Sequence, residues 1–321
     1  MKITKISGDY TPLRQGILFG ISTESEVPTD LVVEIVNSTN EKVVATQFLH
    51  SVTEAQVNIA PYIEPTSSHI PSQCKCISIA DTPLISHHIR IGDVVSEPVL
   101  TWLNTEAIVL PSLISSMPQT RRISREECDE IALMVGGGKN ISVAISSDLD
   151  EYVDIQHYTT TGCAILSISP MDFDEKCRCI DVVIRCNDQQ IGNLHYNIVP
   201  ALNGSVRVAW ISEYGSIERY SFPAAISSKH LSKRQIIRTT EGWHAANGST
   251  EYSMSLCSHY EPRATIEALA QIVSSPKVWI ENEKGCDEVA VTSSVVEQSI
   301  FNGPNCICLD MVVWHRKEAV C

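Results

Sequence analysis

The chain has 321 residues, of which 43% are hydrophobic, and its 24 Lys and Arg against 38 Asp and Glu give a formal charge of −14. This charge disfavours general binding of nucleic acid through phosphate contacts, because an acidic surface repels phosphate. No run approaches the ~20 apolar residues of a membrane helix and the start lacks the apolar core of a secretory signal, so we expect synthesis in the cytoplasm and no membrane span. The length predicts two or three domains of ~100 residues each.

Residues 1–113 alternate short apolar runs with turn residues. The valine-rich runs at 31–37 and 43–48 are joined by a cluster of Asn, Ser, Thr, Glu and Lys, which is typical of a turn between two strands. Regularly spaced short strands of this kind are typical of an antiparallel sandwich. We therefore predict an N-terminal β-sandwich domain over 1–113.

The next segment, 110–122, contains apolar residues without a period, is interrupted by prolines and ends in a basic pair. It fits an interdomain linker, and it equally fits an arm that becomes ordered on a neighbouring subunit. In an arm, the apolar side chains would bury area on the neighbour while the two arginines would meet acidic surface. The candidate interface residues are Leu110, Leu113, Ile114, Met117, Arg121 and Arg122.

Residues 121–203 are predicted to form a middle β domain. The sequence Ser-Arg-Glu-Glu at 124–127 has the form of a helix capping box, which would start a helix. The competing interpretation is a β-hairpin, because 129–135 and 140–146 flank three consecutive glycines and the second segment alternates cleanly. We favour the hairpin. Since no Gly-Lys-Ser/Thr sequence follows on a helix, the glycines indicate a loop tip and not a phosphate site.

Residues 204–321 are predicted to form a C-terminal β domain, beginning with a hairpin at 206–222. Apolar residues alternate with a period of two on both sides of a break at 214–216, which places them on one apolar face. Gly215 in the break can take the positive φ that a tight turn requires.

One helix is predicted in this last domain, near 263–273. Apolar residues recur there at helical spacing, a proline stands near the first turn, and another proline follows at position 276. The helix should pack its apolar face on a sheet. The fold expected for the whole chain is mainly β, with two or three antiparallel β-sandwich-like domains, the last carrying one packed α-helix.

The chain contains twelve cysteines, and six of them form Cys-x-Cys pairs at the start of apolar, strand-like runs. They fit small buried hydrophobic residues of a protein made in a reducing compartment. Two such pairs could also supply four thiolates to zinc, although the usual Cys-x2-Cys spacing is absent, and disulfides are possible with no connectivity fixed by the sequence. We expect no metal and no cofactor. The pairs are Cys74 with Cys76, Cys177 with Cys179 and Cys306 with Cys308.

Catalytic signatures are missing from the sequence. His87 and His88 are adjacent, so on a strand their rings point to opposite faces and cannot easily share a metal; we expect them at the surface or at an edge. No Gly-x-Ser-x-Gly elbow occurs, and the acidic loops lack the glycine and terminal glutamate of an EF-hand. We therefore predict no catalytic residue and no enzyme. The aromatic residues of the third domain could form a sugar platform or simply fill its core; they are Trp210, Tyr214, Tyr220, Trp243, Tyr252 and Tyr260.

Four segments, at 13–19, 57–62, 210–218 and 274–280, resemble proteins from virion gene clusters of tailed phages and prophages of gut Bacteroidales. The resemblance implies a non-enzymatic virion structural protein of the tail, connector or baseplate region, with no catalytic residues to carry over. Its expected partners are other virion proteins and copies of itself in a cyclic homo-oligomer, and DNA would slide past an acidic wall without specific binding. The alternative is a glycan- or protein-binding β-sandwich module of the adhesin or receptor-binding type.

Overall fold

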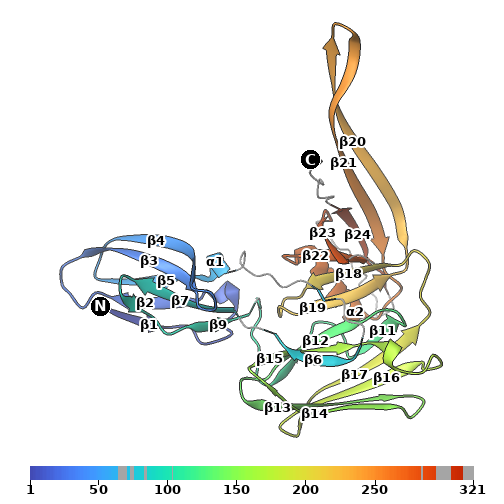
Figure 1. Ribbon diagram of the computed structural model, residues 1–321, viewed down its shortest axis with the longest axis horizontal. Helices are drawn as coiled ribbons and strands as arrows, with labels where there is room; N and C mark the ends of the chain where they lie inside the picture. Colours follow the sequence, from blue (N-terminus) through green and yellow to red (C-terminus); the bar gives the residue numbers. More distant parts are fainter. Residues whose placement is uncertain are drawn as a thin grey trace.

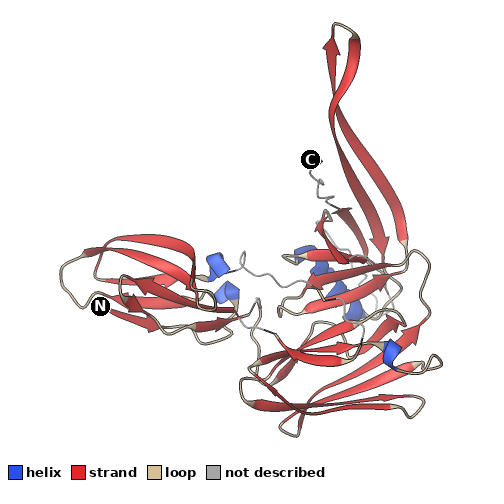
Figure 2. Cartoon of the chain, in the orientation of Figure 1, coloured by secondary structure: helices blue, strands red, loops and turns tan. Residues whose placement is uncertain are grey.

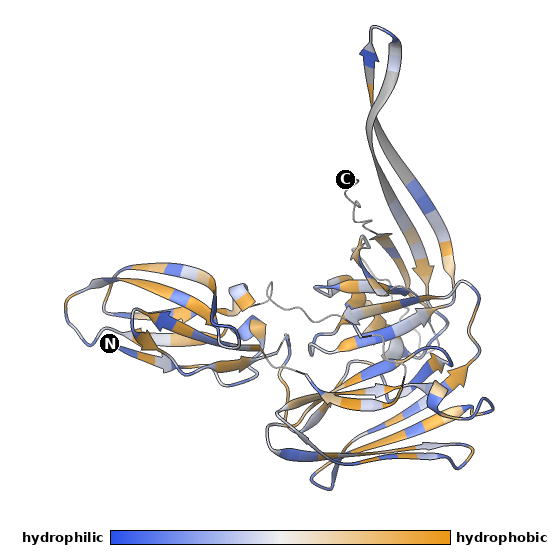
Figure 3. Ribbon diagram, in the orientation of Figure 1, coloured by the Kyte–Doolittle hydropathy of each residue, from blue (hydrophilic) through white to orange (hydrophobic). Residues whose placement is uncertain are grey.

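The computed structural model describes residues 1–63, 71–72, 76–82, 85–102, 104–282, 285–293 and 305–313, with backbone alone for 231–235, 237, 244–251 and 313. Strands make up 57% of the chain and helices 8%, which confirms the predicted mainly β class. The helices are short compared with the strands (Figure 2). Hydrophobic and polar residues alternate along many of the strands, as expected where one face of each sheet is buried (Figure 3).

The first sandwich lies at the left of Figure 1 and packs two sheets around one apolar core. Its smaller sheet has the order β1 (Lys2–Lys5), β2 (Leu18–Ser22) and β5 (Glu54–Asn58). Its larger sheet has the order β4 (Lys42–Val52), β3 (Thr29–Asn37), β7 (Ile85–Ile91) and β8 (Val94–Val95), with β9 (Val99–Thr101) also paired to β7. Two short helical segments, η1 (Leu13–Gln15) and α1 (Ala60–Ile63), close one end.

The second sandwich places a four-stranded sheet on a five-stranded one. The first has the order β10 (Ser112–Ile114), β12 (Asp129–Met134), β15 (Cys163–Ile168) and β6 (Ser78–Asp81). The second has the order β11 (Thr120–Ser124), β17 (Gln189–Val199), β16 (Cys179–Cys186), β13 (Lys139–Ser147) and β14 (Tyr152–Thr160), and the 3-10 turn η3 (Pro170–Asp172) precedes β16. Pairing is antiparallel except between β11 and β17, which run parallel. Side chains from both sheets form one continuous core.

β6 ties the two sandwiches together. It comes from the part of the sequence that we placed in the N-terminal domain, yet it pairs with β15, and Ile77 and Ile79 pack on the core of the second sandwich. β7 then returns to the first sandwich and β10 enters the second again. The domain limit predicted at residue 113 therefore does not follow the sheets, because a four-residue strand does not reveal its partner.

The pairing predicted for the middle domain was wrong, although both segments are strands. β12 pairs with β10 and β15, whereas β13 pairs with β14 and β16, so the two lie in different sheets and do not form a hairpin. The alternative helix is absent too. Ser124 and Glu127 do make a bond of the capping-box kind, from the Ser124 amide to Glu127 Oε2 at 2.8 Å, but it closes a turn.

The C-terminal unit is built on one seven-stranded sheet. Its order is β19 (Ile217–Phe222), β18 (Val206–Ile211), β22 (Val278–Asn282), β23 (Gly285–Val291), β24 (Cys308–Val313), β21 (Gly242–Cys257) and β20 (Ala225–Thr239). The predicted helix is confirmed as α2 (Arg263–Ala270), continued by the 3-10 turn η4 (Gln271–Ser274). Ile266, Leu269 and Ile272 belong to the same apolar core as Trp210 of β18.

The predicted hairpin at 206–222 is confirmed by the pairing of β18 with β19, and Gly215 has a φ of 82° in its turn. The prediction of a single apolar face was wrong. Val208 and Trp210 enter the main core, while Ala209 and Ile217 on the other face are buried with further apolar residues. On this second face, Arg207 and Arg219 also pair with Glu127 and Glu130 of the second sandwich, so the hairpin is buried on both faces.

The feature that sequence reasoning missed is the long hairpin β20–β21, whose strands have 15 and 16 residues. β21 pairs with β24 only over its last six residues, from Tyr252 to Cys257. Beyond them the described pairing is between β20 and β21 alone, and the two strands project from the body as a ribbon (Figure 1). We call this ribbon, residues 231–251, the arm. Its sequence is rich in Ser, Thr, Lys and Arg, so it lacks the apolar alternation that marks a strand packed on a core.

Candidate functional site

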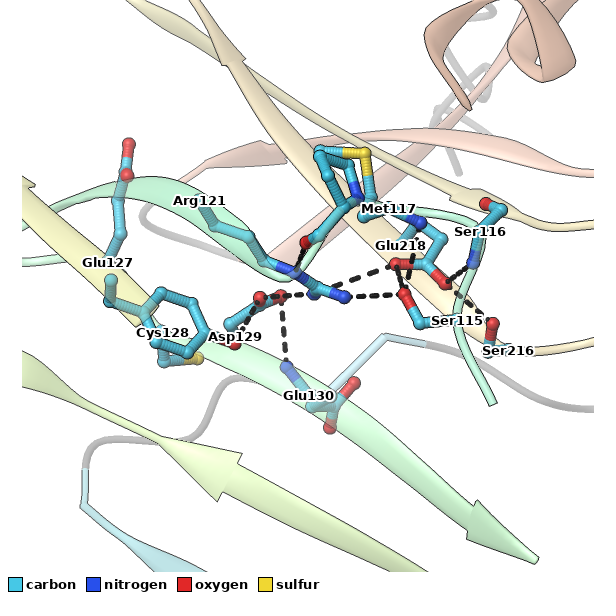
Figure 4. A network of polar contacts seen from close by, with 12 residues as sticks. Ser115, Ser116, Met117, Arg121, Glu127, Cys128, Asp129, Glu130, Ser216 and Glu218 are labelled. Atoms are coloured by element: carbon cyan, nitrogen blue, oxygen red, sulfur yellow. Dashed lines mark hydrogen bonds and ion pairs between the residues drawn. The ribbon is translucent and has the colours of Figure 1, made fainter. Parts of the chain in front are cut away.

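The strongest concentration of charge lies where the second sandwich meets the C-terminal sheet, around the start of β12. All six residues of β12 are buried. Ile131 and Leu133 face the core of the second sandwich, whereas Ala132 and Met134 pack on its outer side. At the start of the strand, Asp129 and Glu130 meet charged side chains from β11, β18 and β19. Figure 4 shows Arg121 of β11, Asp129 of β12 and Glu218 of β19 pointing toward one another across the junction.

Arg121 lies at the centre of the first part of this network. Its Nη1 is 2.9 Å from Asp129 Oδ2 and 3.7 Å from Glu218 Oε2, and its Nε donates to the Pro118 carbonyl at 3.1 Å. Burial would lower the pKa of Arg121, but Tyr196, Asp129 and Glu218 reverse this effect and raise it. Burial opposes ionisation of Asp129, yet the guanidinium of Arg121 holds the pKa of that carboxyl below its usual value. Both groups are therefore charged at neutral pH.

Glu218 is the buried carboxylate on the facing strand β19. It accepts hydrogen bonds from Ser115 Oγ at 2.9 Å, from the Ser116 amide at 3.0 Å and from Ser216 Oγ at 2.8 Å. Burial raises the pKa of Glu218 even though Arg121 lies close by. Ser115 and Ser116 lie between β10 and β11, in the segment that joins the two sheets of the second sandwich, so Glu218 attaches this segment to the C-terminal sheet.

A second group of ion pairs extends the network along the same junction. Arg219 contacts Glu130 at 2.8 Å and Glu281 at 2.6 Å, while Arg207 contacts Glu127 at 2.9 Å and Glu281 at 3.2 Å. Glu281 of β22 therefore bridges two arginines. Burial raises the pKa of Glu130, whereas Arg207 and nearby hydroxyl and amide donors overcome burial at Glu127 and lower its pKa.

A cavity of about 470 Å³ lies beside the network, between β11 and the first turn of α2. Four arginines reach its wall, but each is already paired with a carboxylate of the chain. Their six partners outnumber them, so the junction carries no excess positive charge that would hold an anion. The partners are Glu127, Asp129, Glu130, Glu218, Glu261 and Glu281. The arrangement joins two β units.

The structure places most of the candidate interface residues inside the chain. Leu113 packs on the second core close to Gly192, Ile114 is buried, and Met117 packs on the C-terminal core. Arg121 is buried in the ion network. Residues 110–122 are therefore a structural connection within the chain. They are not an extension that binds a neighbouring subunit, because side chains buried in this way cannot also cover a neighbour.

The other two candidates keep contact with solvent. Leu110 has 36% of its surface exposed, and the side chain of Arg122 is 49% exposed while it pairs with Glu261 at 3.3 Å. Gly215 lies in the turn next to Tyr214, whose carbonyl accepts a hydrogen bond from Trp102 Nε1 at 2.8 Å. The predicted turn thus also forms part of the contact between the first sandwich and the C-terminal unit.

Two of the cysteines form a disulfide bond, whose pairing the sequence alone did not determine. Cys257 and Cys308 lie directly opposite each other on β21 and β24 and form a disulfide. Burial raises the pKa of Cys163 to about 12 and that of Cys177 to about 11, so both stay protonated thiols at neutral pH. No group of three or more potential metal ligands occurs among the described residues, and Cys74 lies outside them.

The two adjacent histidines are buried, so the prediction of a surface position was wrong. His87 is 0% exposed and His88 is 6% exposed, both on the central strand β7. Burial, followed by the charge of His88, lowers the pKa of His87 to about 4. A neutral imidazole is small enough to fill a place in this sandwich, and alternation along the strand did not show that both faces would be covered.

The aromatic residues of the third domain do not form one platform. Trp210 and Tyr220 lie in the core, whereas Trp243 and Tyr260 are 71% and 72% exposed at separate places on the C-terminal unit. Trp243 lies near the end of the arm, where the Arg238 guanidinium is 5.8 Å from its ring centre. Among the described tryptophans, the exposed indole therefore lies near the turn of the β20–β21 hairpin, which projects far from the core (Figure 1).

No protein-family model matches the chain, and no curated protein matches it. Among solved structures, trypsin-activated alpha-2-macroglobulin from Escherichia coli aligns with 8% identity and a TM-score of 0.19, over 91% of this chain and 25% of that one. The chain thus spans about a quarter of the length of that protein, and a likeness this low carries no argument about function. Within the described residues, no helix has the length and apolar character needed to cross a bilayer.

Proposed function

We propose that this chain is a non-enzymatic structural subunit of a tailed-phage virion, in the tail, connector or baseplate region, and that copies of it assemble into a ring. The observation that carries the proposal is the arm. A two-stranded ribbon is at best marginally stable alone in water, so a ribbon of this length is expected to gain stability from a partner.

The charge distribution supports assembly with copies of the same chain. Residues 225–257 contain four basic and two acidic residues, so the hairpin carries +2 and the rest of the chain −16. A basic projection and an acidic body attract one another between molecules, and the attraction also helps the encounter. A head-to-tail contact of this kind generates a ring when the rotation closes.

The ion network supports the same role, because a building block must keep its shape under load. Arg121, Arg207 and Arg219 pair with carboxylates contributed by two β units, so separating the units would leave buried charges unpaired. Removing one partner of a buried pair costs about 3 to 5 kcal/mol. The junction therefore resists opening.

The test is the composition of particles. Tailed particles purified from a culture of the bacterium that carries this sequence should contain the chain in stoichiometric amount by quantitative mass spectrometry. Antibody-coupled gold should mark one position on the tail or neck in electron micrographs. Particles that lack the chain, or gold scattered over cell debris alone, would refute the proposal.

One observation favours a second function, a glycan-binding module. Trp243 is exposed beside Arg238, and an exposed indole with a neighbouring cation can stack on a sugar ring. Binding of a stable monomer to a glycan array, lost in Trp243→Ala and kept in Tyr260→Ala, would favour this function over assembly.

A further inference from the structure

The end of the arm has the character of a binding tip. Ile236 is 65% exposed and Trp243 is 71% exposed, and Arg238 lies between them in sequence, over the indole ring. We call these three residues the arm tip. Large apolar side chains that water surrounds at the end of a projection contribute nothing to the core of their own chain. Tryptophan and arginine are also the residues that most often dominate binding energy in protein interfaces.

A complementary surface exists on the outer face of the first sandwich. Val32 of β3 and Phe48 of β4 are directly paired and are 47% and 65% exposed. Asp30 precedes Val32 by two residues on β3, and its side chain is 75% exposed; its carboxylate accepts a hydrogen bond from the Ser51 amide at 2.8 Å and lies 3.7 Å from His50 Nδ1. We call Val32, Phe48 and Asp30 the β3–β4 patch. It offers apolar contact next to an acidic group, and β4 is an edge strand of its sheet.

One chain cannot bring the two surfaces together. The first sandwich and the arm extend in different directions from the junction of the other two β units. Their far ends lie at separate extremities of the molecule (Figure 1). The contact must therefore be made between two copies.

We propose that the arm tip binds the β3–β4 patch of a second copy of this chain, with Trp243 and Ile236 on Val32 and Phe48 and with Arg238 near Asp30. This inference rests on the proposed assembly and names its contact surfaces. The contact is heterologous, since each copy offers its arm to one neighbour and its patch to another. The same geometry would therefore continue around a ring.

Photo-crosslinking of the full chain tests the contact. Benzoylphenylalanine is placed at position 243, and this chain is mixed with an isotope-labelled wild-type chain so that crosslinks between molecules can be recognised. Crosslinks from position 243 to residues 29–52 of the labelled copy are expected. Crosslinks to any other surface, or a chain that remains monomeric at every concentration, would overturn the proposal.

Two sets of variants measure the contact in solution by analytical ultracentrifugation. Trp243→Ala and Phe48→Ala should each raise the dissociation constant about 30-fold, and the double variant should not multiply the two effects, because the side chains contact each other. Arg238→Glu should weaken association and Asp30→Lys in the partner should restore it. Tyr260→Ala, which removes an equally exposed aromatic ring outside the arm, should change nothing.

These measurements separate the contact from the proposed function. If particles contain the chain but the crosslinks map elsewhere, the contact is refuted and the virion role stands. If the crosslinks map as expected but particles lack the chain, the virion role is refuted and the contact stands. Multiplicative effects of Trp243→Ala and Phe48→Ala, or no rescue by Asp30→Lys, would also refute the contact.

Discussion

Arg121 illustrates how a charged residue can serve structure when its partners come from several elements. It is buried with Asp129 and Glu218, and Tyr196 donates to Asp129 Oδ2 at 2.9 Å. Burying charges costs solvation energy that their attraction must offset, so such a pair is weak evidence for added stability. Removing one member of a buried pair is strongly destabilising, because the remaining charge is then buried with neither water nor a partner.

Replacement of Arg121 by methionine should therefore destabilise the chain by about 3 to 5 kcal/mol, because Asp129 would lose its cation. Arg14→Met is the control. Its side chain is 71% exposed and pairs with Glu106, which is 48% exposed, so a loss of about 1 kcal/mol or less is expected. Urea denaturation of both variants measures the difference, and equal losses would contradict a special role for the buried pair.

His87 should make the chain sensitive to acid. Its folded pKa is lowered to about 4 from 6.5 by burial, so the folded state favours the neutral ring. This contribution to stability is fully present above the unfolded pKa and is lost as the pH falls from 6.5 toward 4. Neither ring nitrogen has a hydrogen-bond partner among the described residues.

Replacement of His87 by leucine should raise stability at neutral pH by about 1 to 3 kcal/mol, because it removes unsatisfied polar atoms from the sandwich. It should also flatten the decline of the melting temperature between pH 6.5 and 4. His50→Leu, at a side chain that is 79% exposed, is the control and should leave the slope unchanged. A wild-type slope in His87→Leu would show that other groups cause the acid sensitivity.

At the scale of elements, the turn between β18 and β19 depends on backbone conformation. Gly215 has a φ of 82°, and its amide donates to the Ser212 carbonyl at 2.9 Å. A valine there should cost about 1 to 3 kcal/mol, because side chains with a branched Cβ rarely adopt this conformation. Gly8→Val is the control. No atom lies within 4 Å of a Cβ placed at Gly8, and its φ is outside the range that side chains rarely adopt.

Thermal denaturation of the two glycine variants makes the comparison. A loss of stability in Gly215→Val together with an unchanged Gly8→Val supports the strained turn. Equal falls in the two melting temperatures would contradict the strained turn, because restriction of the unfolded chain by valine is the same at both positions and by itself raises stability.

At the scale of the whole molecule, the body and the arm are different kinds of structure. The body contains three β units that share the β6 crossing, the ion network and the contact of Trp102 with the Gly215 turn. Among its described side chains, the β20–β21 hairpin packs only its base on a core, through Ala225, Tyr252, Met254 and Leu256. The body should therefore fold without the arm.

Deletion of residues 229–251, with a two-residue turn in their place, should leave the melting temperature of the body unchanged while abolishing self-association. The physical reason is that none of the side chains that the structure describes in this ribbon belongs to an apolar cluster. Calorimetry and sedimentation of the same sample measure the two properties. Loss of a cooperative transition would show that the ribbon stabilises the body.

The sequence by itself determined which segments become strands over much of the chain, the mainly β class, the helix near 263–273 and the turn at Gly215. These features depend on local periodicity and on the conformational range of single residues, which a sequence displays directly. The tertiary structure alone decided that β6 joins the second sandwich, that β12 and β13 lie in different sheets, and that Arg121 meets Glu218. Each of these joins residues far apart in the chain, and pairing partners are selected by the burial of whole faces, which no single segment contains. The arm was missed for the same reason: its strands pair mainly with each other and bury too little to leave a periodic pattern.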